Sequence, residues 1–247
     1  MTLTRIGCAG WSISRDAAPQ FDGPGSHLQR YAAVLDAAEI NSSFYRPHQP
    51  QTYARWADSV PDNFRFSVKL PKSITHERRL ADSADLLDAF AAEAGALQHK
   101  LGCVLVQLPP SLVLDAVAAE RLWRQLRERF NCMLACEARH GSWFGEEASA
   151  LLSAHGVTRV IADPPAGKPG PFVPTTAPVY IRLHGSPRIY ASLYSEEQLQ
   201  QVADFMAGKD GWCVFDNTMN GRQTLQALRL KELLASSDGA TGDSARL

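Results

Sequence analysis

Residues 134–143 read Leu-Ala-Cys-Glu-Ala-Arg-His-Gly-Ser-Trp, and their order of apolar and charged side chains predicts the architecture of the chain. The segment begins with the small and apolar side chains of a buried strand and then places Glu137 and Arg139 two residues apart. Because side chains alternate between the two faces of a strand, these charges share one face. An apolar start and a charged end indicate a strand whose carboxyl end lies at a functional edge of a sheet.

The same apolar-to-polar order recurs along the chain and predicts eight strands. These are Arg5–Gly10, Glu39–Tyr45, Phe64–Leu70, Gly102–Leu108, a strand that begins at Leu134, Thr158–Ala162, Val179–Leu183 and Trp212–Phe215. The predicted helices run from Ser26 through Ala37, from Pro50 to a point before Pro61, over Ala84–Lys100, Asp115–Phe130 and Glu146–His155, onward from Ser195, and over Gln223–Leu234. Ser26 with Gln29, and Ser195 with Gln198, form capping boxes.

Continuous apolar strands between amphipathic helices indicate a parallel sheet that is covered on its outer face. Eight such units in about 250 residues predict an α/β fold, a TIM-type (β/α)8 barrel with eight parallel strands. A doubly wound open sheet is the alternative. It would normally carry a glycine-rich phosphate loop after the first strand, whereas Gly7-Cys8-Ala9-Gly10 lacks both the third glycine and the helix that should follow.

One unit of the barrel is irregular. Pro164–Pro178 holds six prolines in fifteen residues, so we expect helix 6 to be replaced by a proline-rich loop that packs at the functional mouth of the barrel. No internal boundary is visible. Residues 1–235 are therefore predicted to form a single TIM-barrel-like domain, and the small, polar residues 236–247 a flexible C-terminal tail.

The composition narrows the class of protein. A hydrophobic content of 45% is enough for one large core, and a net charge of −1 indicates no general basic surface for nucleic acid or anionic membrane. The N-terminus lacks the apolar run of a signal peptide, and no segment approaches the ~18 apolar residues of a membrane span. The five cysteines contain no C-x-x-C pair. We expect a cytoplasmic protein with reduced, buried thiols.

Polar side chains collect at the carboxyl ends of the predicted strands, where active sites of this fold lie. The catalytic candidates are Glu137, His184 and Glu39, as the general acid and base groups. The substrate-binding candidates are Lys69, Arg139, Arg182, Asn41, Tyr45, Trp11, His76, Gln107, His140, Trp143, Asp163, Asp216 and Asn217. His184 is the group that titrates near neutral pH.

The cations among these residues favour an anionic ligand. Lys69, Arg139 and Arg182 would repel a divalent ion at the same mouth, and two arginines with a lysine suit a carboxylate or phosphate. We therefore expect no metal and no other cofactor. Ser142 lacks the G-x-S-x-G surroundings of a serine nucleophile. A purely structural layer of ion pairs that plugs the barrel is the alternative interpretation.

An ordered set of motifs spans residues 7–217. The motifs are Gly7-x-x-Gly10-Trp11-Ser12, Glu39-x-Asn41-x-x-Phe44-Tyr45, Phe64-x-Phe66-x-Val68-Lys69, Ile74-Thr75-His76, Gln107-Leu108-Pro109-Pro110, Glu137-x-Arg139-His140-x-Ser142-Trp143, Arg182-Leu183-His184-Gly185 and Phe215-x-Asn217. With them the chain resembles the YecE-like family, catalogued as domain of unknown function 72. The resemblance implies a TIM-barrel-like fold and supplies no activity.

Two departures from the family pattern bear on the site. The family usually has Phe-Asn-Asn where this chain has Phe215-Asp216-Asn217, which argues against Asp216 as a required carboxylate. The segment after Ser12 also lacks the family's Tyr and Trp-x-x-Phe-Tyr-Pro pattern, so the resemblance assigns no role to the first loop.

Three functions fit these residues. The leading hypothesis is a metal-independent enzyme that performs acid–base chemistry on a small anionic or sugar-phosphate-like molecule. The second is a protein that binds or cleaves nucleic acid; the nearly neutral charge disfavours it, because DNA affinity normally needs several phosphate contacts. The third is a non-catalytic small-molecule binding protein. The residues predict no particular reaction and no oligomeric state.

Overall fold

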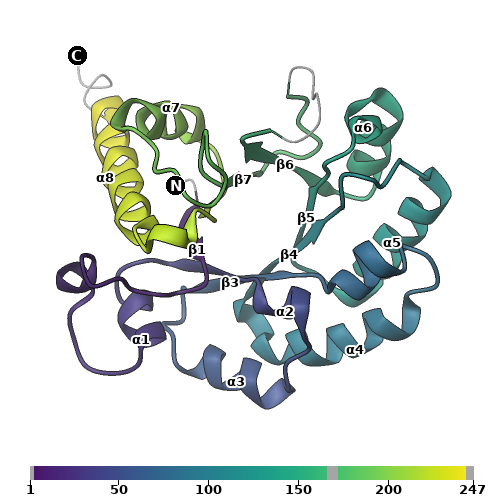
Figure 1. Cartoon of the computed structure of the whole chain (residues 1–247), viewed down its shortest axis with the longest axis horizontal. Helices are drawn as coiled ribbons and strands as arrows, with labels where there is room; N and C mark the ends of the chain where they lie inside the picture. The colour runs from purple at the N-terminus through teal and green to yellow at the C-terminus, as the bar shows by residue number, and fades with distance from the viewer. Residues whose placement is uncertain (1–2, 166–171, 243–247) are drawn as a thin grey trace.

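The computed structural model describes residues 3–165 and 172–242, and its eight strands close into a parallel barrel (Figure 1). The strands are β1 Thr4–Ala9, β2 Ala37–Ile40, β3 Arg65–Lys69, β4 Leu101–Gln107, β5 Met133–Glu137, β6 Val157–Asp163, β7 Val179–Leu183 and β8 Gly211–Phe215. They follow one another around the barrel in chain order, and parallel pairing of β1 with β8 closes it. The predicted TIM-type (β/α)8 barrel is confirmed.

Helices cover the outside of the strands (Figure 1). They are α1 His27–Ala32, α2 Ser42–Tyr45, α3 Pro50–Asp58, α4 Ala84–Ala94, α5 Ala116–Arg129, α6 Glu146–Ala154, α7 Glu196–Met206 and α8 Gln223–Gly242. Short 3-10 or π turns lie at η1 Ala18–Phe21, η2 Ser73–Glu77, η3 Gly95–Lys100, η4 Gly141–Phe144 and η5 Thr218–Asn220. Both predicted capping boxes are present, at Ser26 and Ser195. No helix in the described ranges has the length and apolar character that crossing a bilayer requires.

The second strand differs from its prediction. It ends at Ile40 instead of Tyr45, because Ser42–Tyr45 fold into the single turn of α2. The Ser43 hydroxyl lies 3.0 Å from the Ile40 carbonyl oxygen and 2.6 Å from that of Lys69, which ties this turn to the end of β3. Ser43 therefore leaves the strand face that carries Glu39, whereas the Asn41 side chain still reaches Asp216.

Three helix ends also differ from their predictions. The helix expected to run through Ala37 stops at Ala32, and Ala37 begins β2. The helix expected to reach Lys100 stops at Ala94, and the 3-10 turn that follows contains Gln98 at a φ of 53°. The last helix continues to Gly242, so the first part of the predicted flexible tail is helical, while residues 243–247 lie outside the described part of the chain.

The connection between β6 and β7 has no helix in its described parts, residues 164–165 and 172–178; residues 166–171 lie outside the described ranges. The Thr175 hydroxyl donates to the Val157 carbonyl oxygen at 2.6 Å and accepts from the Arg159 amide at 2.8 Å. The Arg159 guanidinium donates to the Val173 carbonyl oxygen at 2.9 Å. The second part of this loop thus runs beside β6 toward the amino end of that strand and does not cross the mouth. This path follows because the parallel strand β7 begins at the same end of the barrel as β6.

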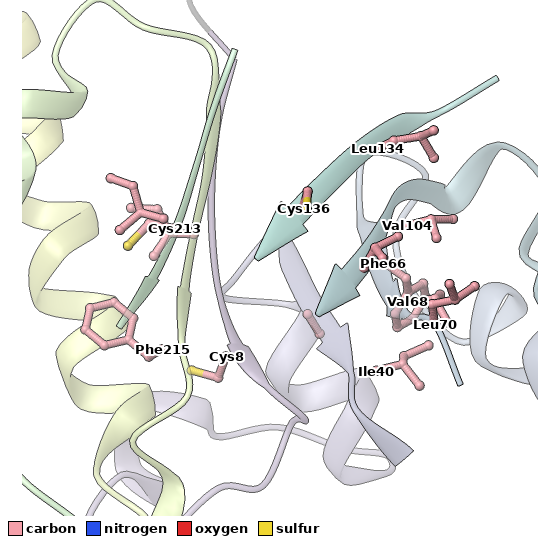
Figure 2. Close-up of a cluster of buried hydrophobic side chains, with 14 of the residues drawn as sticks. Cys8, Ile40, Phe66, Val68, Leu70, Val104, Leu134, Cys136, Cys213 and Phe215 are labelled. Atoms are coloured by element: carbon pink, nitrogen blue, oxygen red, sulfur yellow. The ribbon is translucent and has the colours of Figure 1, made fainter. Parts of the chain in front are cut away.

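Strand alternation separates two cores. Outward side chains pack beneath the helices, among them those of Cys8, Cys136, Cys213 and Phe215 (Figure 2). Inward side chains form a smaller apolar cluster, whose members are Ala37, Cys103, Leu105, Ala135, Val160, Tyr180, Trp212 and Val214. Nearer the carboxyl ends of the strands the inward positions become polar, and they create the candidate site. All five cysteines are free thiols.

Candidate active site at the carboxyl mouth of the barrel

Arg182, on β7, lies at the centre of the inward polar cluster, and its side chain is fully buried. Its Nε and Nη2 atoms donate to the two carboxylate oxygens of Glu39 at 3.0 and 2.6 Å. Nη2 also donates to Asp216 at 2.9 Å, and Nη1 donates to Glu137. Burial opposes the charge, but the three carboxylates outweigh it and raise the pKa of Arg182 well above its ordinary value. Every guanidinium nitrogen thus has a carboxylate partner, which leaves none free for a substrate anion.

His184 lies between two of these carboxylates. Its Nδ1 atom is 3.0 Å from Oδ2 of Asp216, and its Nε2 atom is 3.2 Å from Oε1 of Glu137. Burial disfavours a charged ring, but the hydrogen bonds to Asp216 and Glu137 prevail and raise its pKa. Asp216 also accepts a hydrogen bond from Asn41 at 3.3 Å. The raised pKa favours the imidazolium form of His184, in which both ring nitrogens carry a hydrogen and face a carboxylate.

Glu137, at the end of β5, joins the buried cluster to the open side of the mouth. Its Oε1 atom accepts hydrogen bonds from Gln107 at 2.9 Å and from Nε and Nη2 of Arg139 at 3.0 and 2.7 Å. Burial favours the neutral carboxyl, but Arg182, His184 and Arg139 outweigh it and hold the pKa of Glu137 well below its ordinary value. The Arg139 side chain is 23% exposed, and its Nη1 atom donates to no described residue.

Lys69, the last residue of β3, is a further cation of the mouth and is only 6% exposed. Its Nζ atom lies 4.2 Å from the centroid of the Phe44 ring and donates a hydrogen bond to no described residue. Burial and the neighbouring Arg182 lower the pKa of Lys69 to about 8, against the opposing effect of the carboxylates. Lys69 therefore loses its proton more readily than an ordinary lysine.

His76 and Tyr45 share the Phe44 contact with Lys69. The ring centroids of His76 and Tyr45 each lie 5.0 Å from that of Phe44, in edge-on geometry. Burial and the charges on Lys69 and Arg139 lower the pKa of His76, which makes it a neutral imidazole at neutral pH. Tyr45 is 71% exposed on α2. These side chains form the outer rim of the site on the side of β3.

Two polar residues of the cluster were absent from the predicted site. The Tyr180 hydroxyl lies 2.9 Å from Oε2 of Glu39 and 2.7 Å from the Ser67 hydroxyl. Because β7 is not a neighbour of β2 or β3, these bonds cross the barrel interior. Tyr180 precedes Arg182 by two residues, and Ser67 precedes Lys69 by two, so strand alternation alone places both on the inward face.

Both tryptophans predicted at the site lie elsewhere. Trp11 packs edge-on against Trp56 and Phe66, with ring centroids 5.2 and 6.1 Å away, and Phe66 belongs to the outer core beneath the helices. Trp143 is fully buried, and its indole nitrogen donates to the Leu112 carbonyl oxygen at 2.9 Å. Neither ring is available to stack on a ligand in the mouth.

Three polar candidates lie outside the cluster: Asp163 faces away from the mouth, and Asn217 and His140 support loops. Asp163 faces outward, where it lines a hollow with Ile181 and Leu183 of the outer core. Asn217 is fully buried and donates to the Ser192 carbonyl oxygen and to Gln226. The Nδ1 atom of His140 accepts from the Ser142 amide at 3.2 Å and so caps the turn η4, which shapes the loop after β5.

The donor set does not match a metal centre. Among the described residues no group of three or more His, Cys, Asp or Glu side chains has an arrangement that could hold a metal ion. The carboxylates of Glu39, Glu137 and Asp216 instead converge on the guanidinium of Arg182. A hard cation needs such oxygens as ligands, and here an internal cation already engages them.

Comparisons with known proteins agree on one family. The family model described as "Protein of unknown function DUF72" matches residues 5–246. UPF0759 protein YecE of Escherichia coli (strain K12) is 33% identical over 144 residues, which make up 55% of this chain and 52% of that protein. UPF0759 protein YunF of Bacillus subtilis (strain 168) is 27% identical over 172 residues, or 65% of this chain and 60% of that protein. These matches thus span little more than half the length of the curated relatives.

A solved structure shows the same likeness over nearly the whole chain. The crystal structure of a DUF72 family protein from Thermotoga maritima MSB8 superposes with a TM-score of 0.80 at 28% sequence identity. The superposition covers 94% of this chain and 99% of that one.

Proposed function

This chain belongs to the DUF72 family, and we propose that it is a metal-independent enzyme that performs acid–base chemistry on a small anionic molecule at the carboxyl mouth of the barrel. The proposal rests on a difference between the cations of the mouth: one has carboxylate partners for all of its nitrogens, and two have donors without a described acceptor. Arg182 is fully engaged by carboxylates, whereas Lys69 and Arg139 keep donors that no described residue accepts.

The charge balance of the mouth supports an anionic ligand. Three carboxylates, Glu39, Glu137 and Asp216, face Arg182 and His184. When His184 is protonated, Lys69 and Arg139 bring the cations to four, and the site then holds one positive charge in excess. A buried excess charge is costly unless it is paired, and a bound carboxylate or phosphate group would pair it.

Glu137 and His184 are the groups suited to move protons. Glu137 lies beside Arg139, where the anionic substrate would bind, and His184 contacts the same Glu137 carboxylate oxygen. A proton can therefore pass between His184 and Glu137, and Glu137 can exchange it with the substrate. Glu39 has a different role in this scheme. Both of its carboxylate oxygens accept from Arg182, so it holds that guanidinium in place.

A small molecule fits this site better than nucleic acid does. The net charge of the chain is −1, and the cations of the mouth are buried or half-buried, so they suit a group that enters the barrel more than an extended phosphate backbone. Non-catalytic binding of the same small anion is the alternative that the experiment below must separate from catalysis.

The anion site is tested with inorganic phosphate at fixed ionic strength, with the thermal unfolding midpoint as the readout. Phosphate should stabilise the wild type in proportion to RT ln(1 + [L]/Kd), and Arg139→Gln should abolish this effect. Arg129→Gln is the matched control, because the Arg129 side chain is 19% exposed and pairs with Asp88 away from the mouth. The absence of any phosphate effect on the wild type would refute the anion site.

The catalytic part is tested by solvent exchange. Small phosphorylated and carboxylated compounds are incubated with the protein in D2O, and exchange of carbon-bound hydrogen is followed by NMR. The proposal expects exchange with the wild type and a loss of roughly 100-fold or more in Glu137→Gln, the size of a typical general acid–base contribution. Phosphate binding without exchange or turnover of any compound would favour the non-catalytic alternative.

A further inference from the structure

We propose that Lys69 is a covalent nucleophile that forms an imine with a carbonyl group of the substrate. The substrate class then becomes a small aldehyde or ketone that also carries a phosphate or carboxylate group. This inference rests on the proposed anion site, which would hold the charged end of such a molecule at Arg139.

The first observation is that the Lys69 ammonium donates to no described residue although the side chain is only 6% exposed. The four other described lysines all have an acceptor: Lys72 pairs with Glu77, Lys100 donates to the carbonyl oxygens of Val60 and Pro61, Lys209 to that of Phe205 and Lys231 to that of Val34. Lys100 is the informative comparison, because it is 8% exposed and Lys69 is 6% exposed. Lys100 thus has a protein acceptor for its ammonium group, whereas Lys69 has none among the described residues.

The second observation is the set of groups around the amine. Lys69 Nζ lies over the Phe44 ring, and the charge of Arg182 acts on it from inside the barrel. A lysine becomes nucleophilic when it is desolvated beside an apolar surface or placed next to another cation, and here both conditions hold. At a pKa of about 8, half of the Lys69 side chains are neutral amines at pH 8. That neutral fraction is about 100-fold larger than for an ordinary lysine with a pKa of about 10.4.

The third observation is a neutral base on the same aromatic ring. The His76 ring centroid lies 5.0 Å from that of Phe44, which Lys69 also contacts, and the charge of Lys69 lowers the pKa of His76. His76 lies on the same ring as Lys69, and we assign to it the uptake and return of a proton through water.

The step consumes one proton from the solvent and no other reactant. The lone pair of Lys69 Nζ attacks the carbonyl carbon, and the carbonyl oxygen takes that solvent proton to become a hydroxyl group. His76 removes a proton from the new ammonium nitrogen, which gives a neutral carbinolamine. The C–O bond then breaks as His76 returns that proton to the hydroxyl group, so one water leaves and a protonated imine remains. Nothing is oxidised or reduced, and hydrolysis reverses the step.

The experiment is reductive trapping. The wild-type protein is incubated at pH 8 with sodium cyanoborohydride and one of three probes: pyruvate, dihydroxyacetone phosphate or uncharged propanal. Intact mass and peptide mapping then locate the adduct. We expect the two anionic probes to label Lys69 first, roughly 10–100-fold faster than the exposed Lys72, because the pKa of Lys69 is lowered and the amine lies at the anion site. Lys69→Arg should lose this adduct, and Lys72→Arg should keep it.

The outcomes separate this inference from the anion site. If phosphate stabilises the wild type but the adducts are spread over exposed lysines, the Lys69 nucleophile is refuted and the anion site stands. If propanal labels Lys69 as fast as the anionic probes do, and Arg139→Gln changes neither rate, the anionic substrate class is refuted and the nucleophile stands. The peptide map of the wild type decides the first question even if a Lys69 variant fails to fold.

Discussion

Arg182→Met is the most informative single change, because it removes the charge at the centre of the mouth and keeps most of the side-chain volume. The fully buried guanidinium accounts for hydrogen bonds to Glu39, Glu137 and Asp216. Without it these carboxylates face one another inside the barrel, and breaking a buried ion pair on one side costs roughly 3–5 kcal/mol. For a chain of this size that loss lowers the thermal midpoint by roughly 6–20 °C.

The predicted loss of stability in Arg182→Met depends on pH in a characteristic way. In the wild type Arg182 holds the pKa values of Glu137 and Asp216 low, so their stabilisation is present above the unfolded pKa values and is lost as pH falls through the folded ones. In Arg182→Met burial would dominate and raise the pKa values of Glu137 and Asp216. As pH falls, these carboxylates take up protons, and the cost of burying their charges in the variant decreases. The deficit in unfolding free energy should therefore shrink between about pH 7 and about pH 5.

Urea unfolding of the wild type, Arg182→Met and Arg139→Met at several pH values measures these effects. Arg139→Met is the control, because the Arg139 side chain is 23% exposed and Glu137 keeps Arg182, Gln107 and His184 as partners. It should cost less than about 1 kcal/mol. A deficit below about 1 kcal/mol in Arg182→Met, or a deficit equal at both ends of the pH range, would contradict the picture of Arg182 as the partner that neutralises buried acids.

Three further changes test single contacts of the mouth by urea unfolding. Tyr180→Phe should lower the free energy of unfolding by about 1–2 kcal/mol, because it removes the hydroxyl that bridges Glu39 and Ser67. An unchanged urea midpoint would contradict that bridge. His184→Asn should lower the free energy of unfolding most below about pH 6.5, and the loss should decrease as pH rises through the raised pKa of His184. A loss of stability that is independent of pH would contradict a charged ring. Lys69→Met should raise the free energy of unfolding by roughly 1–3 kcal/mol below pH 8, with the gain fading toward pH 10.5, because it removes a buried cation that lacks an acceptor; a loss of stability would contradict this burial cost.

Strand alternation explains why the centre of the site could be predicted from the sequence. Glu39, Lys69, Glu137, Arg182 and Asp216 each lie at the carboxyl end of a strand on its inward face, and the structure brings all five to one mouth. The same rule would have found Tyr180, two residues before Arg182. It failed for Asp163, because the polar residues of β6, which include Thr158 and Arg159, fall on both of its faces, and the sequence pattern did not show which face is inward.

The positions of the loop residues could not be predicted in the same way. Trp11 and Trp143 follow strands, but the direction of a loop depends on contacts with distant residues, here Trp56 for the first and Leu112 for the second. The end of β2 was missed for a related reason. Ser43 bonds to the backbone at the end of β3, and no periodic pattern in its own segment signals that contact.

The polar residues of the barrel mouth form two layers, and the layers have different roles. The inner layer stabilises the fold, and the outer layer is the candidate binding site. Glu39, Tyr180 and Arg182 are fully buried and satisfy one another, as an architectural layer should. Lys69 and Arg139 lie on the outer side of that layer with unused donors, as a binding site should. Stability and ligand binding should therefore be separable. Tyr180→Phe should lower stability but keep the phosphate effect, whereas Arg139→Gln should remove the phosphate effect with little loss of stability. A single variant of the inner layer that abolished both would show that the two layers act as one.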